Sequence, residues 1–187
     1  MADLVLTFDT HPGRSLTLAL FKDCKNSRDI RAAITDASLP ECAYINASLV
    51  VDTFAVHLAA HRAIAAESSG GLLSKSLHTE LIYGLSGTKH VGESLKRFGL
   101  QDSVDSSTCT SSSSSGVSLL MAAFDCPPEQ MQALKSRIQG TQVPLSELAT
   151  LSDNQLLDQF YKITKAEMQG RSRAEVVAFR IGAKDCL

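Results

Sequence analysis

The chain has 187 residues, and 44% of them are hydrophobic, which is enough to bury the core of a single domain. Its formal net charge of −2 argues against a protein that coats nucleic acid by charge alone, although a local basic patch is compatible with it. The sequence contains no apolar run of about 18 residues, so we expect no membrane-spanning helix.

The first part of the chain predicts strands that alternate with helices. The apolar run at 15–21 is typical of a buried strand, and a helix is expected at 27–37. Residues 44–51 have strand character at their apolar end. Asp52 is suited to cap the helix that follows, which runs to about residue 66 and is apolar over much of its circumference.

Two helices joined by a glycine-bounded turn are predicted for residues 74–100. Leucines recur at four-residue steps in the first helix, which Ser74 or Ser76 can cap. The second helix has the same periodicity, and Gly99 is expected to end it in the left-handed conformation. The turn carries polar and basic side chains, and a loop held between packed helices is a favourable place to bind a ligand.

The composition changes sharply at 102–116, where a serine-rich stretch without apolar periodicity predicts a flexible surface loop. Strand and helix patterns resume after this loop. They are a strand at 117–124, a helix to about 138, an extended segment at 141–145, and helices at 153–163 and from 164 or 172 to 182. The order of elements predicts one layered α/β or α+β domain over residues 1–187.

Patterns that resemble catalytic or metal sites lack the required partners. His57 and His61 share one helical face, but a zinc site needs a third ligand, so we interpret them as a surface or interface pair. The sequence GLSGTK at 84–89 has the wrong spacing for a nucleotide-binding P-loop. Its glycines either let backbone N–H groups approach a phosphate or ribose, or merely cap the preceding helix.

The five cysteines have spacings unlike those of metal-binding motifs. We expect them to be reduced thiols in an intracellular protein, and the first residues lack the pattern of a secretory signal. A cysteine–histidine nucleophile stays open as an alternative, but the residues present no defined catalytic set, metal site or cofactor site.

Three stretches carry a more specific signal: LTLALFKDCKNSRDIR at 16–31, YINASLVVDTFAVHLAAHRAI at 44–64 and SLHTELIYGLSGTKHVGESLKRFGL at 76–100. They resemble the PRPK-binding protein (TPRKB) family, the small non-catalytic subunit of the KEOPS/EKC complex. The most specific part is ELIYGLSGTKHV followed by LKRFG, and the final AKDCL is similar to the ending of the family. The resemblance covers most of the chain outside the serine-rich loop.

The resemblance implies a central, mostly antiparallel or mixed sheet packed by about seven helices. It also implies binding to the small atypical kinase PRPK, support of that kinase's activity, and partnership with the other KEOPS/EKC subunits. The implied process is the formation of threonylcarbamoyladenosine next to the anticodon of tRNA, with the tRNA captured by its single-stranded 3′ CCA end. Catalysis would belong to other subunits, so no enzyme activity, cofactor or metal is expected of this chain.

The resemblance also implies site residues, which we locate on this sequence by its motifs. The tRNA-binding residues, with His78 added because it lies close in sequence, are Arg62, Lys75, His78, Glu80, Ser86, Gly87, Lys89 and His90. The candidate kinase-binding face is on the last helix, because this helix is more apolar than a terminal helix on the surface needs to be. These residues are Val176, Phe179 and Ile181, and their ordinary docking onto the core is the alternative.

Two other functions stay open. One is a kinase-binding scaffold without tRNA contact, which the net acidity favours, as does Gly84 at a position where relatives often carry a polar or basic side chain. The other is an unrecognised cysteine-dependent enzyme. The sequence shows no targeting signal, and the resemblance leads us to expect the protein in the cytoplasm and the nucleus.

Overall fold

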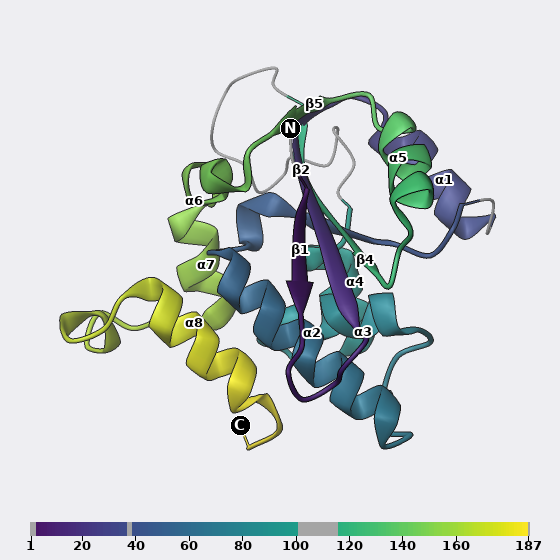
Figure 1. Ribbon diagram of the computed structural model, residues 1–187. Helices are drawn as coiled ribbons and strands as arrows, with labels where there is room; N and C mark the ends of the chain where they lie inside the picture. The colour runs from purple at the N-terminus through teal and green to yellow at the C-terminus, as the bar shows by residue number, and fades with distance from the viewer. Residues whose placement is uncertain (1–2, 37–38, 101–115, 187) are drawn as a thin grey trace.

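The computed structural model describes residues 3–36, 39–100 and 116–186, which form a sheet with helices on both of its faces (Figure 1). The strands are β1 (Leu4–Thr7), β2 (Ser15–Cys24), β3 (Ala43–Asn46), β4 (Val117–Phe124) and β5 (Thr141–Val143). They pair antiparallel in the order β1-β2-β4-β3, and β5 pairs with β2 beyond the end of β1.

The helices occupy the segments between and after these strands. They are α1 (Ser27–Thr35), α2 (Thr53–Ser68), α3 (Leu77–Leu85), α4 (Val91–Phe98), α5 (Pro128–Ser136), α6 (Leu148–Leu151), α7 (Asn154–Tyr161) and α8 (Arg173–Gly182). Within the described ranges, no helix combines the length and the apolar character needed to cross a bilayer. The predicted α+β fold with a mostly antiparallel sheet is confirmed.

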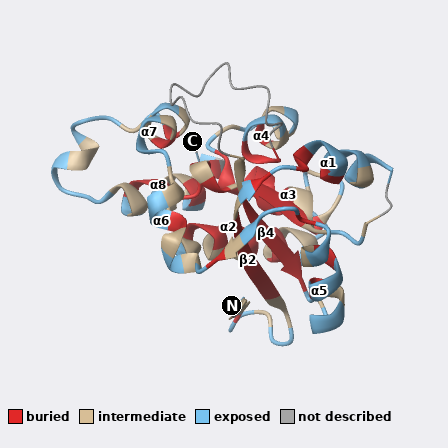
Figure 2. Ribbon diagram, turned by 90° about the horizontal axis from the view of Figure 1, so that it is seen from above, coloured by how far each residue is buried: buried red, intermediate tan, exposed pale blue. Residues whose placement is uncertain are grey.

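Strands β2 and β4 are buried on both faces because successive side chains of a strand point in opposite directions. Leu16, Leu18 and Leu20 face the core that α2, α3, α7 and α8 cover, whereas Ala19 and Phe21 face the core under α1 and α5. Figure 2 shows β2 and β4 buried between the two helix layers. This double burial explains why both strands are apolar runs rather than alternating sequences.

The sequence placed most elements correctly and missed two. Strand β1 and the short helix α6 were not predicted, because four-residue segments carry too little periodicity. The predicted strand at 44–51 ends at Asn46, whose side chain accepts a hydrogen bond from Ser48 N and starts a 3-10 turn. The predicted flexible loop at 102–116 lies outside the described residues except for Gly116.

Gly99 ends α4 as predicted, but the predicted left-handed conformation was wrong. Gly99 has φ −73°, so it is not left-handed. A side chain there would collide with the carbonyl oxygen of Leu95, and the backbone of Gly99 bridges to Ile45 of β3. The glycine therefore allows a close approach between the end of α4 and the sheet rather than a left-handed turn.

Replacing Leu120 by Ala should destabilise the fold strongly. Leu120 is fully buried in β4, and removing such a side chain costs about 2–5 kcal/mol through lost transfer free energy and a residual cavity. Urea unfolding measures this loss. The matched control is Leu73→Ala, at a position 65% exposed, which should stay within about 0.5 kcal/mol of the parent. A loss under about 1 kcal/mol for Leu120→Ala would contradict the burial of this face of β4.

Candidate functional site

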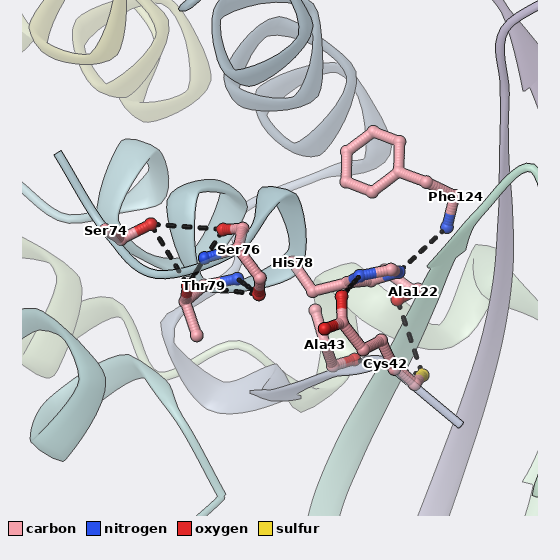
Figure 3. Close-up of polar contacts among 9 residues, drawn as sticks. Cys42, Ala43, Ser74, Ser76, His78, Thr79, Ala122 and Phe124 are labelled. Carbon is pink, nitrogen blue, oxygen red and sulfur yellow. Dashed lines mark hydrogen bonds and ion pairs between the residues drawn. The ribbon is translucent and has the colours of Figure 1, made fainter. Parts of the chain in front are cut away.

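Helix α3 begins at a network of hydroxyl groups (Figure 3). Ser76 Oγ accepts a hydrogen bond from Thr79 N (3.4 Å), and Thr79 Oγ1 accepts one from Ser76 N (3.0 Å). This reciprocal pair satisfies backbone donors that the first turn leaves free. Ser76 is therefore the N-cap, and Ser74 extends the network through its hydroxyl, 3.0 Å from Thr79 Oγ1.

A groove of about 640 Å³ lies at the opposite end of α3, where the α3–α4 turn faces the end of α7 and the side of α8. Five cationic side chains and one carboxylate line it, although the whole chain has a net charge of −2. Its lining comprises Gly87, Thr88, Lys89, His90, Glu93, Arg97, Phe98, Gln159, Phe160, Tyr161, Lys162, Arg180 and Lys184. Such a groove concentrates positive potential on an otherwise acidic protein.

An aromatic ring and a guanidinium that line this groove lie one over the other. Arg97 Cζ lies 4.8 Å from the centre of the Phe160 ring, within the range of a cation–π contact. Glu93, one turn earlier on α4, holds the same guanidinium at 2.5 Å between Oε1 and Nη2. Phe160 packs in turn near Phe98, with ring centres 6.2 Å apart. Glu93 and Phe160 therefore hold the Arg97 guanidinium in place, and Phe98 supports the Phe160 ring.

Further cations that line the groove come from the end of α7 and from α8. Lys162 ends α7 in the left-handed conformation (φ 52°) and is exposed. Arg180 of α8 pairs with Glu167 at 2.8 Å between Nη2 and Oε1. Its Nε is buried and has no hydrogen-bond partner in the described structure. A buried N–H without an acceptor is unfavourable, so only the part of the Arg180 guanidinium that pairs with Glu167 is satisfied.

The structure places the predicted tRNA-binding residues at the two ends of α3, apart from Arg62, which lies on α2. Gly87, Lys89 and His90 line the groove, and the three are exposed. Ser86 lies beneath them with no exposed area, and its Oγ lies 2.6 Å from Ser94 Oγ and 2.9 Å from the Tyr83 carbonyl. Its hydroxyl therefore supports the turn from below rather than facing a ligand.

Lys75 and Glu80 lie at the other end of α3, outside the groove lining. The Glu80 carboxylate is buried, and its Oε2 accepts hydrogen bonds from the backbone N–H groups of Leu73 (3.1 Å) and Ser74 (2.8 Å). Glu80 thus anchors the segment that leads into α3, and its contact with tRNA stays a prediction. Lys75 is exposed.

His78 points from α3 to the sheet (Figure 3), so it also does not belong to the groove. The backbone N–H of Phe124 donates to Nε2 (3.1 Å), which fixes Nε2 as unprotonated, and Nδ1 faces Glu41 Oε2 at 3.4 Å. Burial lowers the pKa of His78, against the smaller opposing effect of Glu41. His78 therefore joins α3 to β4.

Arg62 lies on α2, where its Nη1 donates to the carbonyl of Gly182 at the end of α8 (2.6 Å). This bond connects two helices that run side by side (Figure 1). Arg62 does not line the groove.

The predicted kinase-binding residues differ in exposure. Val176 and Ile181 are buried against the core. For these two residues the structure therefore shows the alternative, which was that the last helix packs on the core of its own domain. Phe179 is 56% exposed on the outer side of α8, with Arg171 Cζ 5.9 Å from its ring centre. Phe54, at the start of the neighbouring α2, is 60% exposed and was not singled out by the sequence.

The two histidines of α2 hold the β1–β2 hairpin. His57 Nε2 lies 3.2 Å from the carbonyl of Thr7, and His61 Nε2 lies 2.7 Å from Thr10 Oγ1. Among the described residues, no three histidine, cysteine or carboxylate side chains converge as metal ligands. A smaller hollow of about 410 Å³ lies in the same hairpin, but its Arg14 is engaged by Glu67 and Asp125.

Sequence reasoning missed the part of the groove that comes from distant segments. Arg97 stands in the LKRFG motif but was not predicted as a site residue, and in the structure it pairs with Glu93. Phe160, Lys162 and Arg180 follow the loop and β4 in the chain, and no local pattern relates them to the α3–α4 turn. Only the fold brings them there.

The model of a protein family described as kinase binding protein CGI-121 matches residues 21–185. The chain belongs to this family. The matched region includes the α3–α4 turn and every segment that lines the groove.

Curated CGI-121 relatives match over most of their length. The chain is 28% identical over 171 residues to the "EKC/KEOPS complex subunit TPRKB" of Danio rerio, which covers 91% of each chain. It is 30% identical over 173 residues to the "EKC/KEOPS complex subunit cgi121" of Neurospora crassa, with 83% of this chain and 84% of the relative covered. A relative of the same name from Aspergillus fumigatus is 27% identical over 154 residues, 78% of this chain and 75% of its own length. The predicted family is therefore confirmed.

The stability of the protein should fall when the pH drops below about 6.5, in part because of His78. Its pKa is lower in the folded than in the unfolded chain, so the unfolded chain takes up the proton first. The contribution of His78 is complete above the ordinary pKa of histidine and is lost as the pH falls through the folded-state value. Urea unfolding between about pH 5 and 8 measures the slope.

The variant His78→Gln should flatten this dependence, whereas Leu73→Ala, which removes no titratable group at an exposed position, should leave it unchanged. Equal slopes for the parent and His78→Gln would show that protonation of His78 does not oppose folding.

Proposed function

We propose that this chain is a non-catalytic subunit of an EKC/KEOPS complex that binds a small PRPK-type kinase, supports its activity and helps to recruit tRNA. The description of its family as a kinase-binding protein supports the first part, and the names of its relatives support membership in the complex. The tRNA part rests on one observation, the basic groove beside the α3–α4 turn.

The groove suits single-stranded RNA better than a duplex. The Arg97 guanidinium, stacked on the Phe160 ring, is a planar group on which an unpaired base can stack, and the other cations that line the groove can follow the phosphates. We propose that it takes the 3′ CCA end of tRNA. The complex would thereby hold a substrate for threonylcarbamoyladenosine formation next to the anticodon.

A scaffold without tRNA contact is the first alternative, but Gly84 does not favour it. A Cβ on Gly84 would lie 3.4 Å from the Cβ of Ala59, inside the packing of α3 on α2. A side chain at this position would therefore meet α2 and not the groove. The net acidity of the chain also has little weight, because cations are concentrated in the groove.

A cysteine-dependent enzyme is the second alternative, and three of its candidate nucleophiles are poor ones. Burial raises the pKa of the Cys24 thiol to about 12. Burial also raises the pKa values of Cys42 and Cys126. Since the thiolate is the nucleophile, these cysteines are disfavoured as catalysts near neutral pH. We therefore propose that the subunit has no enzymatic activity of its own.

We propose that the kinase docks on the outer side of α8 and α2. Phe179 and Phe54 supply exposed aromatic surface on these adjacent helices, and large aromatic anchors dominate many interfaces. We also propose that the protein acts in the cytoplasm and the nucleus, where its tRNA and kinase partners would be found.

Removing groove cations should weaken tRNA binding and its salt dependence. For Lys89→Met and Lys162→Met, the slope of log K against log salt should decrease by about 0.7 per lost phosphate contact. Phe160→Leu should lower affinity by about 1–3 kcal/mol, because it keeps an apolar side chain but removes the stacking face. Fluorescence anisotropy with labelled tRNA, with and without its CCA end, measures both effects.

Lys75→Met is the matched control, since Lys75 is exposed at the far end of α3 and should leave tRNA affinity unchanged. Equal effects of Lys75→Met and Lys89→Met, or equal affinity for tRNA without the CCA end, would count against the groove as the tRNA site. Wild-type chain that binds no tRNA would favour the scaffold alternative.

Phe179→Ala should weaken binding to the PRPK-type kinase from the same source at least tenfold, and Phe54→Ala should add to the loss. Affinity should fall because each substitution removes an exposed aromatic side chain that the interface with the kinase would bury. Isothermal titration in moderate salt measures the affinity. Leu73→Ala, at another highly exposed apolar position in the α2–α3 connection, should bind as the parent does.

Unchanged kinase affinity in the double variant Phe54→Ala, Phe179→Ala would exclude this face. Absence of kinase binding by the wild-type chain at micromolar concentrations would exclude the kinase-binding function itself.

A further inference from the structure

A buried lysine lies beneath the α3–α4 turn. Lys184 is 3% exposed and belongs to the 3-10 turn Lys184–Cys186 that follows α8. Its Nζ donates to the carbonyl of Tyr83 and to Ser86 Oγ (3.2 Å), and it lies 3.3 Å from the centre of the Tyr83 ring. The segment after α8 therefore reaches the end of α3 through one ammonium group.

The end of a helix is a favourable position for this ammonium group. The last carbonyls of a helix lack intrahelical donors, and the C-terminal end carries partial negative charge. A cation at this end satisfies both needs, and the Tyr83 ring adds a cation–π contact. A lysine is rarely buried unless such partners compensate for its lost hydration, so the three contacts identify a defined role.

Hydrogen bonds continue from Lys184 across the turn. Ser86 Oγ, which accepts from Lys184, lies 2.6 Å from Ser94 Oγ, and Ser94 Oγ donates to the carbonyl of His90 (2.9 Å). The hydrogen bonds can therefore form one chain, in which Lys184 donates to Ser86, Ser86 donates to Ser94, and Ser94 donates to the carbonyl of His90. These bonds join the two ends of the segment that carries Gly87 and Lys89.

We propose that Lys184 is a positioning residue that fixes the α3–α4 turn, and with it one wall of the basic groove. Removing its ammonium loosens the turn and displaces the exposed groups of Gly87, Lys89 and His90, although Lys184 need not touch the bound RNA. The part of this inference that concerns RNA affinity rests on the proposed function, and the part that concerns the turn does not.

The first test uses the full chain without RNA. The variant Lys184→Met keeps a side chain of similar length but has no donors. Amide hydrogen exchange over residues 86–90, measured by mass spectrometry, should become about tenfold faster or more. Lys162→Met, which removes an exposed groove cation at the end of α7, should leave exchange over 86–90 unchanged. Unchanged exchange in Lys184→Met would overturn the proposal.

The second test separates positioning from a phosphate contact. Lys184→Met should lower tRNA affinity about tenfold with an unchanged salt slope, whereas Lys162→Met should reduce the slope. Kinase affinity should stay the same. A reduced salt slope in Lys184→Met would assign Lys184 to direct phosphate binding and overturn the positioning role.

A more conservative substitution, Ser86→Ala, tests the proposal if Lys184→Met fails to fold. Ser86→Ala removes the hydroxyl that receives the lysine, so it should speed exchange over 86–90 in the same direction. In folded variants, the effects of Ser86→Ala and Lys184→Met on tRNA affinity should be clearly less than additive. Additive effects, or no change in exchange for Ser86→Ala, would contradict the proposal. If the wild-type chain fails to bind tRNA, this result would count against the proposed function alone. The exchange experiment contains no RNA, so it tests the role of Lys184 in the turn independently of tRNA binding.

Discussion

The burial of both faces of β2 and β4 is the constraint on which the rest of the molecule depends. Two apolar faces require two helix layers, and the chain supplies α1 and α5 for one and α2, α3, α7 and α8 for the other. Helices α3, α7 and α8 come together because they cover the same face. The groove is a consequence, since it forms where the end of α3 meets the end of α7 and the side of α8.

The charge of the groove depends on the same arrangement. Five cations lie close together, which would be unfavourable without compensation, and Glu93 and Glu167 hold two of them. Lys184 is stabilised by the end of α3 and by the Tyr83 ring. The exposed cations, Lys89 and Lys162, remain available to an anionic partner, so an acidic protein can present a local site for a polyanion.

The sequence predicted the buried strand at β2, the Asp52 cap of α2 and the helix–turn–helix at α3 and α4, all of which the structure confirms. These features depend on neighbours within one turn or one strand, so their signal is local. The site residues were less predictable. Glu80 and His78 occur in the same motif as Lys89, but burial directs them to the loop before α3 and to β4.

The sequence by itself determined most of the elements, the family and the polar, basic character of the α3–α4 turn, because periodicity, capping residues and motifs are encoded in short segments. Tertiary structure alone decided which polar residues face solvent and which partners complete the groove. Phe160, Lys162, Arg180 and Lys184 reach the turn only because α7 and α8 pack on the same face of the sheet as α3. Such long-range packing depends on the whole core, and no local pattern specifies it.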